Sequence, residues 1–205
     1  MSLDMTPMTE LDAVNVMLAS IGQAPVNTLT VTGIRDVELA RTVLHNQLRS
    51  VLAHGWHFNT DRKYTIAADI NGKLSVPTNA LKLDACDPYV DLVPRMASDT
   101  LRMWARAHHT FDIAANHDAP FEFDVTWLYP FESLPQTARN YIALRAARKF
   151  QTSVIGSDVL FRFTREDELE AKAELDRGEM EQADVNLLFD GSAQSAIWHR
   201  RFLPN

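Results

Sequence analysis

The sequence has little cysteine and no long apolar run. Cys86 is the only cysteine among 205 residues, which excludes an internal disulfide and a metal site built from several cysteines. Residues 1–10 lack the basic and apolar regions of a secretory signal, and no apolar run reaches the ~18 residues that span a bilayer. We therefore expect a protein that is made in the cytosol and stays in a reducing compartment.

Motifs of common enzyme chemistry are also missing. The chain contains no Gly-rich phosphate loop, no GxSxG nucleophile motif and no HExxH zinc motif. Its formal net charge of -7 argues against a dedicated nucleic-acid binder, because such domains are usually basic. The hydrophobic content of 46% is ordinary for a globular domain of this length. We expect neither an enzyme nor a bound cofactor or metal.

Four segments with helical periodicity predict four helices. Thr9 and Asp12 are typical of a cap before a first helix that Gly22 ends, and a second helix is predicted from about 36 to 54. Pro135 favours the start of a third helix, and a long fourth helix is expected over 158–188. Positions on the fourth helix repeat at steps of four and three, which is typical of a packed stripe. These positions are Leu169, Ala173, Asp176, Met180, Ala183 and Leu187.

Between the second and third helices the apolar pattern changes to a period of two. The change occurs at residues 55–60, Gly-Trp-His-Phe-Asn-Thr, where Trp56 and Phe58 are expected to pack as core residues between the two kinds of structure. The Asn71-Gly72 pair predicts a type I′ hairpin between strands at 63–66 and 73–76. Further strands are predicted at 81–83, 89–93, 101–105 and 121–127. We expect one antiparallel sheet of four to six strands with one covered face.

These patterns predict an α+β fold, in which a bundle of about four helices carries a β-rich antiparallel insertion between the second and third helices. The expected division is a discontinuous helical domain of residues 1–57 and 133–189, an insertion of residues 58–132 and a tail of residues 190–205.

Two groups of side chains are candidates for chemistry. Glu122 and Asp124 lie on the polar face of the 121–127 strand and suit acid/base catalysis, although a solvent-facing or partner-facing surface is the favoured interpretation. His108, His109 and His117 form the only histidine cluster. Their spacing matches no metal-binding motif, so a polar loop is favoured over a metal site.

Charge separates the third and fourth helices. The third helix carries only basic charges, at Arg139, Arg145, Arg148 and Lys149. From residue 158 to 190 eleven acidic residues, including Glu166, Glu170 and Glu174, stand against four basic ones. The basic helix would suit nucleic acid, but pairing with the acidic helix, beside it or across a subunit boundary, is more economical. We therefore predict subunit contacts at these seven residues.

The last residues have no periodicity but combine aromatic and basic side chains. Such a mixture is typical both of a terminal segment buried in its own core and of an anchor at an interface, and both interpretations are open. The candidate partner-binding residues are Ile197, Trp198, Arg200, Arg201 and Phe202.

Several strings in this order resemble a known family. TELDAVNVMLASIGQAPV is followed by RDVELARTVLHNQLRSVLAHGWHFNT, by LPQTARNYIALRAARKFQ and then by the long acidic helix. The order resembles the tail tubular protein A family of T7-like short-tailed bacteriophages, over residues 9–189. The most specific strings are residues 24–26, 55–59 and 141–151.

The resemblance implies a structural virion protein, a head-to-tail adaptor. Members form a ring of twelve subunits between the portal protein and the tail nozzle (tail tubular protein B), with the tail fibre nearby. The ring surrounds the channel for the genome, so the passing DNA is contacted without specific binding. The implied fold is a helical bundle with a β-rich insertion. The alternative is a tail-associated polysaccharide or peptidoglycan hydrolase that uses Glu122 and Asp124.

Overall fold

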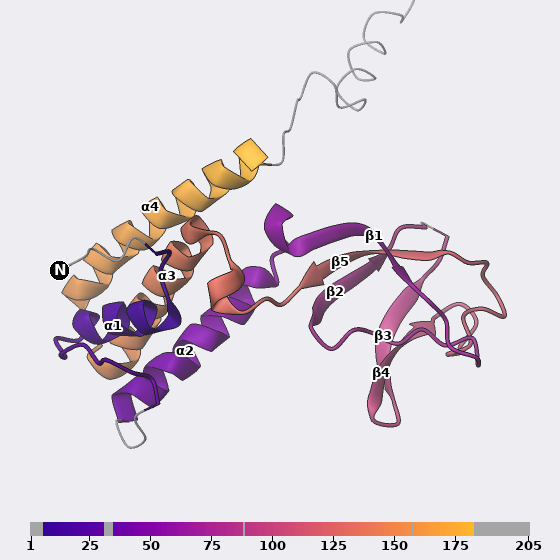
Figure 1. The fold of residues 1–205 in the computed structure, drawn as a ribbon, viewed down its shortest axis with the longest axis horizontal. Helices are drawn as coiled ribbons and strands as arrows, with labels where there is room; N and C mark the ends of the chain where they lie inside the picture. Colours follow the sequence, from indigo (N-terminus) through magenta and orange to yellow (C-terminus); the bar gives the residue numbers. More distant parts are fainter. Residues whose placement is uncertain (1–5, 31–34, 88, 157, 183–205) are drawn as a thin grey trace, which may run out of the picture.

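The computed structural model describes residues 6–30, 35–87, 89–156 and 158–182. The elements are α1 (Glu10–Ser20), α2 (Arg35–Leu52), η1 (His57–Asn59), β1 (Thr60–Ile66), β2 (Ala80–Ala85), β3 (Leu92–Ala97), β4 (Thr100–Ala105), β5 (Phe121–Trp127), η2 (Phe131–Ser133), α3 (Gln136–Val154) and α4 (Asp158–Gln182). Figure 1 shows the helices together on one side and the strands on the other. We call α1–α4 the helical part and β1–β5 the β part.

The central helix of the helical part is α3, because α1, α2 and α4 all pack against it. It buries Ala143, Ala146 and Ala147 among larger residues such as Phe150. Small side chains let neighbouring helices approach closely, since the distance between helix axes depends on the residues at the contact. The alanine-rich sequence of α3 therefore suits a helix covered on several sides.

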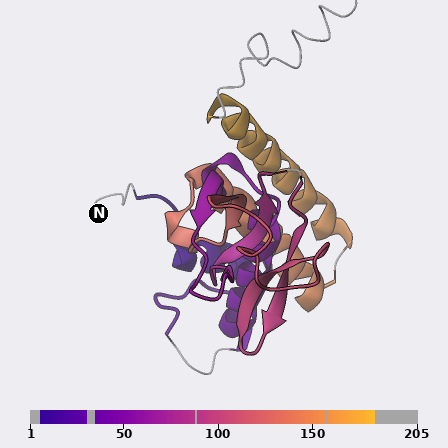
Figure 2. The same ribbon diagram turned by 90° about the vertical axis from the view of Figure 1, so that its right-hand side faces the viewer.

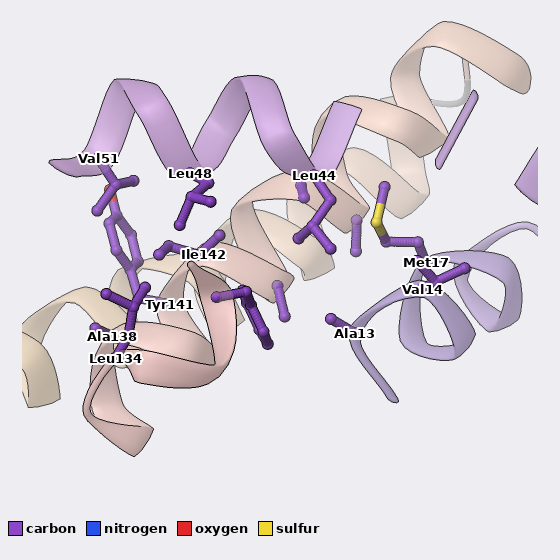
Figure 3. Close-up of a cluster of buried hydrophobic side chains, with 14 of the residues drawn as sticks. Ala13, Val14, Met17, Leu44, Leu48, Val51, Leu134, Ala138, Tyr141 and Ile142 are labelled. Carbon is purple, nitrogen blue, oxygen red and sulfur yellow. The ribbon is translucent and has the colours of Figure 1, made fainter. Parts of the chain in front are cut away.

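Side chains of α1 and α2 fill the space above α3. In Figure 3, Leu44 and Leu48 of α2 point toward Ile142 of α3, and Val14 and Met17 of α1 lie beside them. All five side chains are at least nine-tenths buried. The amphipathic pattern predicted for these helices is confirmed, and their bounds lie within two residues of those expected.

The local signals at the helix ends are confirmed. Thr9 and Asp12 form a reciprocal capping box, in which the Thr9 side chain accepts from the Asp12 amide and the Asp12 carboxylate accepts from the Thr9 amide. Gly22 and Gly156 follow α1 and α3 with φ angles of +78° and +67°. Residues other than glycine rarely adopt this left-handed backbone conformation. Both glycines therefore end their helices.

The β part contains two antiparallel sheets rather than the one predicted. Three strands pair in the order β1-β5-β2, and β3 pairs with β4 in a separate hairpin. The central strand β5 has the bounds expected from its alternation, and it buries Phe121, Phe123 and Val125. These side chains share a core with Met103 of β4. The two sheets therefore cover a common apolar cluster.

The predicted type I′ hairpin at Asn71-Gly72 is wrong. The chain does turn there, but over residues 69–73, and Asn71 does not have the positive φ that a type I′ turn requires. Asp69 organises this turn, because its carboxylate accepts from the Asn71 and Lys73 amides and from Arg102 at 2.7 Å. The Arg102 hydrogen bond, with the amide donors, lowers the pKa of Asp69 to about 2.

Residues 74–76 consequently pair with a different strand. The Val76 amide donates to the Leu101 carbonyl and the Met103 amide donates to the Leu74 carbonyl, both at 2.9 Å. The segment thus extends the β3–β4 hairpin, while β1 pairs with β5. One local antiparallel bridge, between Ala68 and Leu74, remains beside the turn. Beyond it, long-range pairing has replaced the local hairpin that the sequence favours.

The two parts meet at residues 55–60, where one buried side-chain carboxamide hydrogen-bonds to three segments. Asn59 is 1% exposed. Its Nδ2 donates to the carbonyl oxygens of Leu52 (3.0 Å), at the end of α2, and Trp127 (2.8 Å), at the end of β5. Its Oδ1 accepts from the Trp56 amide at 2.7 Å. The Asn59 side chain therefore holds the helical part, the connecting turn and the β part together.

The two aromatic residues of this turn pack on the helical side. Trp56 belongs to the helical core and donates from Nε1 to the Val51 carbonyl at 2.8 Å, while Phe58 stacks beside it. Gly55 has a φ of +87°, and a Cβ there would lie 3.2 Å from Thr126 Oγ1 of β5. The predicted core role of both aromatics is confirmed, but Asn59 makes the bonds to the β part.

The α+β class is confirmed, and the strands follow α2 and precede α3 along the chain. The division into domains of residues 1–57 with 133–189, 58–132 and 190–205 stays a prediction.

Replacing Asn59 by alanine should destabilise the fold strongly. The change removes three hydrogen bonds in a buried position, and of the three backbone partners the Leu52 carbonyl keeps a second donor, the Gly55 amide. We therefore expect the free energy of unfolding to fall by about 3 kcal/mol. Urea unfolding followed by circular dichroism measures this change.

The matched control is Asn46→Ala. Asn46 is an exposed residue of α2 that accepts one hydrogen bond from Arg49, and alanine is the better helix former. We expect a change within about 0.5 kcal/mol. Equal effects of the two substitutions would contradict the role given to Asn59.

Candidate assembly surfaces

The face of α4 that packs on α3 differs from the predicted stripe. Ala171 and Leu175 are 3% and 1% exposed and belong to the helical core. The described part of the predicted stripe instead faces solvent, with Leu169 57% and Met180 72% exposed, Ala173 also exposed and Asp176 half-buried. Ala183 and Leu187 of that stripe lie outside the described residues. Both sets of positions follow steps of three and four, so spacing alone did not distinguish the packed face from the free one.

One ion pair lies inside the contact between α3 and α4. The Arg148 guanidinium bonds to the Glu168 carboxylate, and the two side chains are only 16% and 13% exposed. The helices are antiparallel, because Thr137 near the start of α3 lies beside Gly178 near the end of α4. The sequence-based interpretation that a basic third helix pairs with the acidic helix beside it therefore holds for Arg148 and Glu168.

Arg139 instead binds backbone carbonyls within the subunit. Its guanidinium donates to the carbonyl oxygens of Leu134 (2.7 Å), Met8 (2.8 Å) and Glu132. The residue is 9% exposed. These three bonds join the residues before α1, the η2 turn and the first turns of α3. Its main contacts are thus internal.

Arg145 connects α3 to α2. Its guanidinium donates to Gln47 Oε1 at 3.0 Å, to Tyr141 Oη at 3.2 Å and to Ser50 Oγ at 3.3 Å. Lys149, the fourth basic residue of α3, is exposed. Whether any of these side chains also contacts a neighbouring subunit stays a prediction.

The outward face of α4 is acidic beside its free apolar stripe. Glu166, Glu170 and Glu174 succeed one another at intervals of four residues and are all exposed. Neighbouring like charges at this spacing destabilise an isolated helix slightly, by about 0.2–0.5 kcal/mol per pair. Figures 1 and 2 show α4 at the edge of the helical part, and near its C-terminal end the Glu179 carboxylate accepts from the His57 amide at 2.6 Å. This face is therefore available for contact with a basic, apolar partner.

The carboxylate pair on β5 lies beside an open groove. Glu122 is half-buried and lines a groove of about 520 Å³ together with Lys63, Cys86 and His117. Asp124 is exposed and its Oδ1 accepts from the Lys63 amide at 3.1 Å. The two carboxylates follow one strand on the same side and do not face each other across the groove, an arrangement unsuited to glycosidic cleavage.

The thiol in this groove is not activated. Local desolvation raises the pKa of Cys86, and the hydrogen bond to the Asp124 carboxylate at 3.4 Å raises it further. A thiol with a raised pKa stays protonated at neutral pH and is a poor nucleophile.

Two rings of the histidine cluster meet edge to face, with an angle of 68° between their planes. His108 and His117 lie with ring centroids 5.6 Å apart, and His109 is exposed with a positive φ. Within the part of the chain that the structure describes, no group of three or more His, Cys, Asp or Glu side chains is placed to hold a metal ion.

The partner-binding residues predicted in the tail, Ile197, Trp198, Arg200, Arg201 and Phe202, lie outside the described residues. Sequence reasoning missed the exposed apolar end of the β3–β4 hairpin, where Met96 is 64% and Leu101 37% exposed and the two residues pair across the strands. Two apolar residues flanking a tight turn were the available signal.

Breaking the ion pair between α3 and α4 should destabilise the helical part. Arg148→Met leaves the Glu168 carboxylate mostly buried without its guanidinium, so the free energy of unfolding should fall by about 2–3 kcal/mol. Lys149→Met, the adjacent exposed control, should change it by about 0.5 kcal/mol or less. Similar losses for both variants in urea unfolding would show that the pair contributes nothing specific.

Comparison with known proteins gives the family. A family model described as tail tubular protein matches residues 11–185. Tail tubular protein A of Klebsiella phage KP34 is 28% identical over 156 residues, which cover 74% of this chain and 76% of that protein. No helix among the described residues is long and apolar enough to cross a membrane.

The match extends across both the helical and the β part. It confirms the resemblance found in the sequence, the expectation that the protein is not an enzyme, and its place in the virion tail. The chain belongs to the tail tubular protein family, a structural component of bacteriophage tails.

Proposed function

We propose that this protein is the head-to-tail adaptor of a short-tailed phage. It forms a ring, of twelve subunits by the family resemblance, between the portal protein and the tail nozzle, and it lines the channel through which the genome leaves. The observation that carries the proposal is the family match over residues 11–185, which spans both parts of the fold.

Ring closure needs two different surfaces on each subunit, because a head-to-tail contact repeats the same pair of surfaces around the axis. One of them is the outward face of α4, where Glu166, Glu170 and Glu174 are exposed. The exposed Lys149 is a candidate on the complementary side. Arg139, Arg145 and Arg148 already bond within the subunit, so the complementary surface draws less on them than the sequence suggests.

The charge of the subunit suits a channel for DNA. Each chain carries a formal net charge of -7, so a ring multiplies a negative field around its axis. Phosphates are repelled by such a surface, and the genome passes without binding. The internal bonds of three of the four α3 bases also argue against α3 as a specific DNA-binding element.

The β part is the proposed contact with the nozzle and the fibre. Its β3–β4 hairpin ends in the exposed apolar pair Met96 and Leu101. Exposed apolar side chains that sit together often mark a contact with another protein. The tail of residues 190–205 is the proposed contact with the portal, with Trp198 and Phe202 as aromatic anchors.

Native mass spectrometry of the purified protein, alone and with purified portal, tests this proposal. We expect a monomer alone, because a ring contact seeded by the portal need not be stable by itself, and a ring-sized complex when the portal is present. Failure to enter either a ring or a portal complex would refute the adaptor role.

A variant that lacks residues 192–205 separates the portal contact from the fold. It should lose at least about tenfold in portal affinity, equivalent to about 1.4 kcal/mol, with only a small fall in melting temperature. The matched control is Met96→Ser with Leu101→Ser, which should keep portal binding and weaken binding to the nozzle. A large fall in melting temperature on removal of the tail would place that segment in the subunit's own core.

A further inference from the structure

The free stripe of α4 is an apolar surface that no described element covers. Leu169, Ala173 and Met180 are exposed along about 16 Å of helix, on the side away from the buried Ala171 and Leu175. An apolar stripe at heptad spacing is typical of a helix face with a partner. The partner must lie outside the described elements of this subunit.

Charge restricts what that partner is. Glu166, Glu170, Glu174 and Glu181 are exposed along one flank of the stripe, where Arg177 is the one basic residue among them. A matching segment therefore needs apolar anchors and positive charge together. A purely apolar segment would leave the carboxylates partly desolvated without partners.

One segment of the chain has that composition. Residues 197–203 read Ile-Trp-His-Arg-Arg-Phe-Leu, with four apolar residues, two arginines and no acidic residue. Among the described residues the nearest equivalent is the exposed run Arg62-Lys63-Tyr64 of β1, which has one aromatic residue beside its two bases and lies in the β part. Three of the four bases of α3 are bound within the subunit.

The connecting chain is long enough for an internal contact. Fourteen residues, 183–196, separate the last residue of α4 from Ile197. A flexible chain of that length has a root-mean-square span of about 20 Å. The distance back along α4 from residue 182 to Leu169 is also about 20 Å, at 1.5 Å per residue.

We propose that residues 197–203 bind the outward face of α4 within the free subunit, with the aromatic side chains on the apolar stripe and Arg200 and Arg201 beside the glutamates. This contact does not depend on the adaptor role.

Cross-linking of the full chain tests the contact. In a Cys86→Ser background, Ser195→Cys is combined with Ala173→Cys on the α4 stripe or with the control Thr42→Cys on the exposed face of α2. A short bismaleimide at low micromolar protein should join residues 195 and 173 within one chain at least about tenfold faster than residues 195 and 42. Equal rates, or products only between two chains, would overturn the proposal.

A charge exchange adds a second measurement. Glu170→Lys with Glu174→Lys should slow the 195–173 cross-link about fivefold or more, and so should Arg200→Glu with Arg201→Glu. All four changes together should restore the rate, because opposite charges again face each other. If the cross-linking rate of the fourfold variant instead falls by the sum of the two separate effects, the pairing of the arginines with the glutamates is overturned.

The portal experiment remains separate, so the two ideas fail in different ways. A fast cross-link in a protein that never joins the portal would support the tail contact and refute the adaptor. A portal-bound ring together with equal cross-linking rates for the two cysteine pairs would support the adaptor role and refute the tail contact.

Discussion

The Asn59 carboxamide holds the two parts of this protein in one arrangement. It is almost fully buried and bonds to the end of α2, to the turn and to the end of β5. The side chain makes three hydrogen bonds to backbone groups, of which the Leu52 carbonyl has a second donor, the Gly55 amide. An unpaired buried polar group is costly. Lys82 adds a weaker connection from β2 to the His54 carbonyl at 3.2 Å. A subunit with the proposed adaptor role, which would meet different proteins at its two parts, needs such a fixed junction.

Around α3, the need of buried polar groups for hydrogen-bond partners also decides which charges remain free to contact other proteins. Arg139 binds carbonyls at the start of the helix, Arg145 bonds to α2, and Arg148 pairs with Glu168 of α4. A basic helix thus supports its own subunit, and the acidic surplus of α4 is left on the outside. In the proposed ring, α4 therefore offers an acidic surface for electrostatic contacts. The arginines of α3 bond within the subunit because they are buried or half-buried, and a charge that is removed from water needs a partner nearby.

Sequence patterns predicted what depends on local chemistry. The capping box at Thr9, the glycine ends of α1 and α3 and the alternation of β5 all appear as expected. The strand partner of residues 73–76 was predicted wrongly, because a favourable turn pair does not show which distant strand they pair with. The packed face of α4 was misassigned because both of its stripes share heptad spacing. The role of Asn59 could not be predicted from the sequence, because its three hydrogen-bond partners come together only in the folded protein.

The central claim is that the junction at Asn59 sets one orientation of the β part against the helical part. Spin labels at Glu38→Cys on α2 and Thr100→Cys on the β3–β4 turn, in a Cys86→Ser background, report that orientation through the distance between them. Pulsed electron resonance should give one narrow distance distribution for the native junction and a broad one when Asn59→Ala is added. A distribution that is already broad with Asn59 in place would contradict the account.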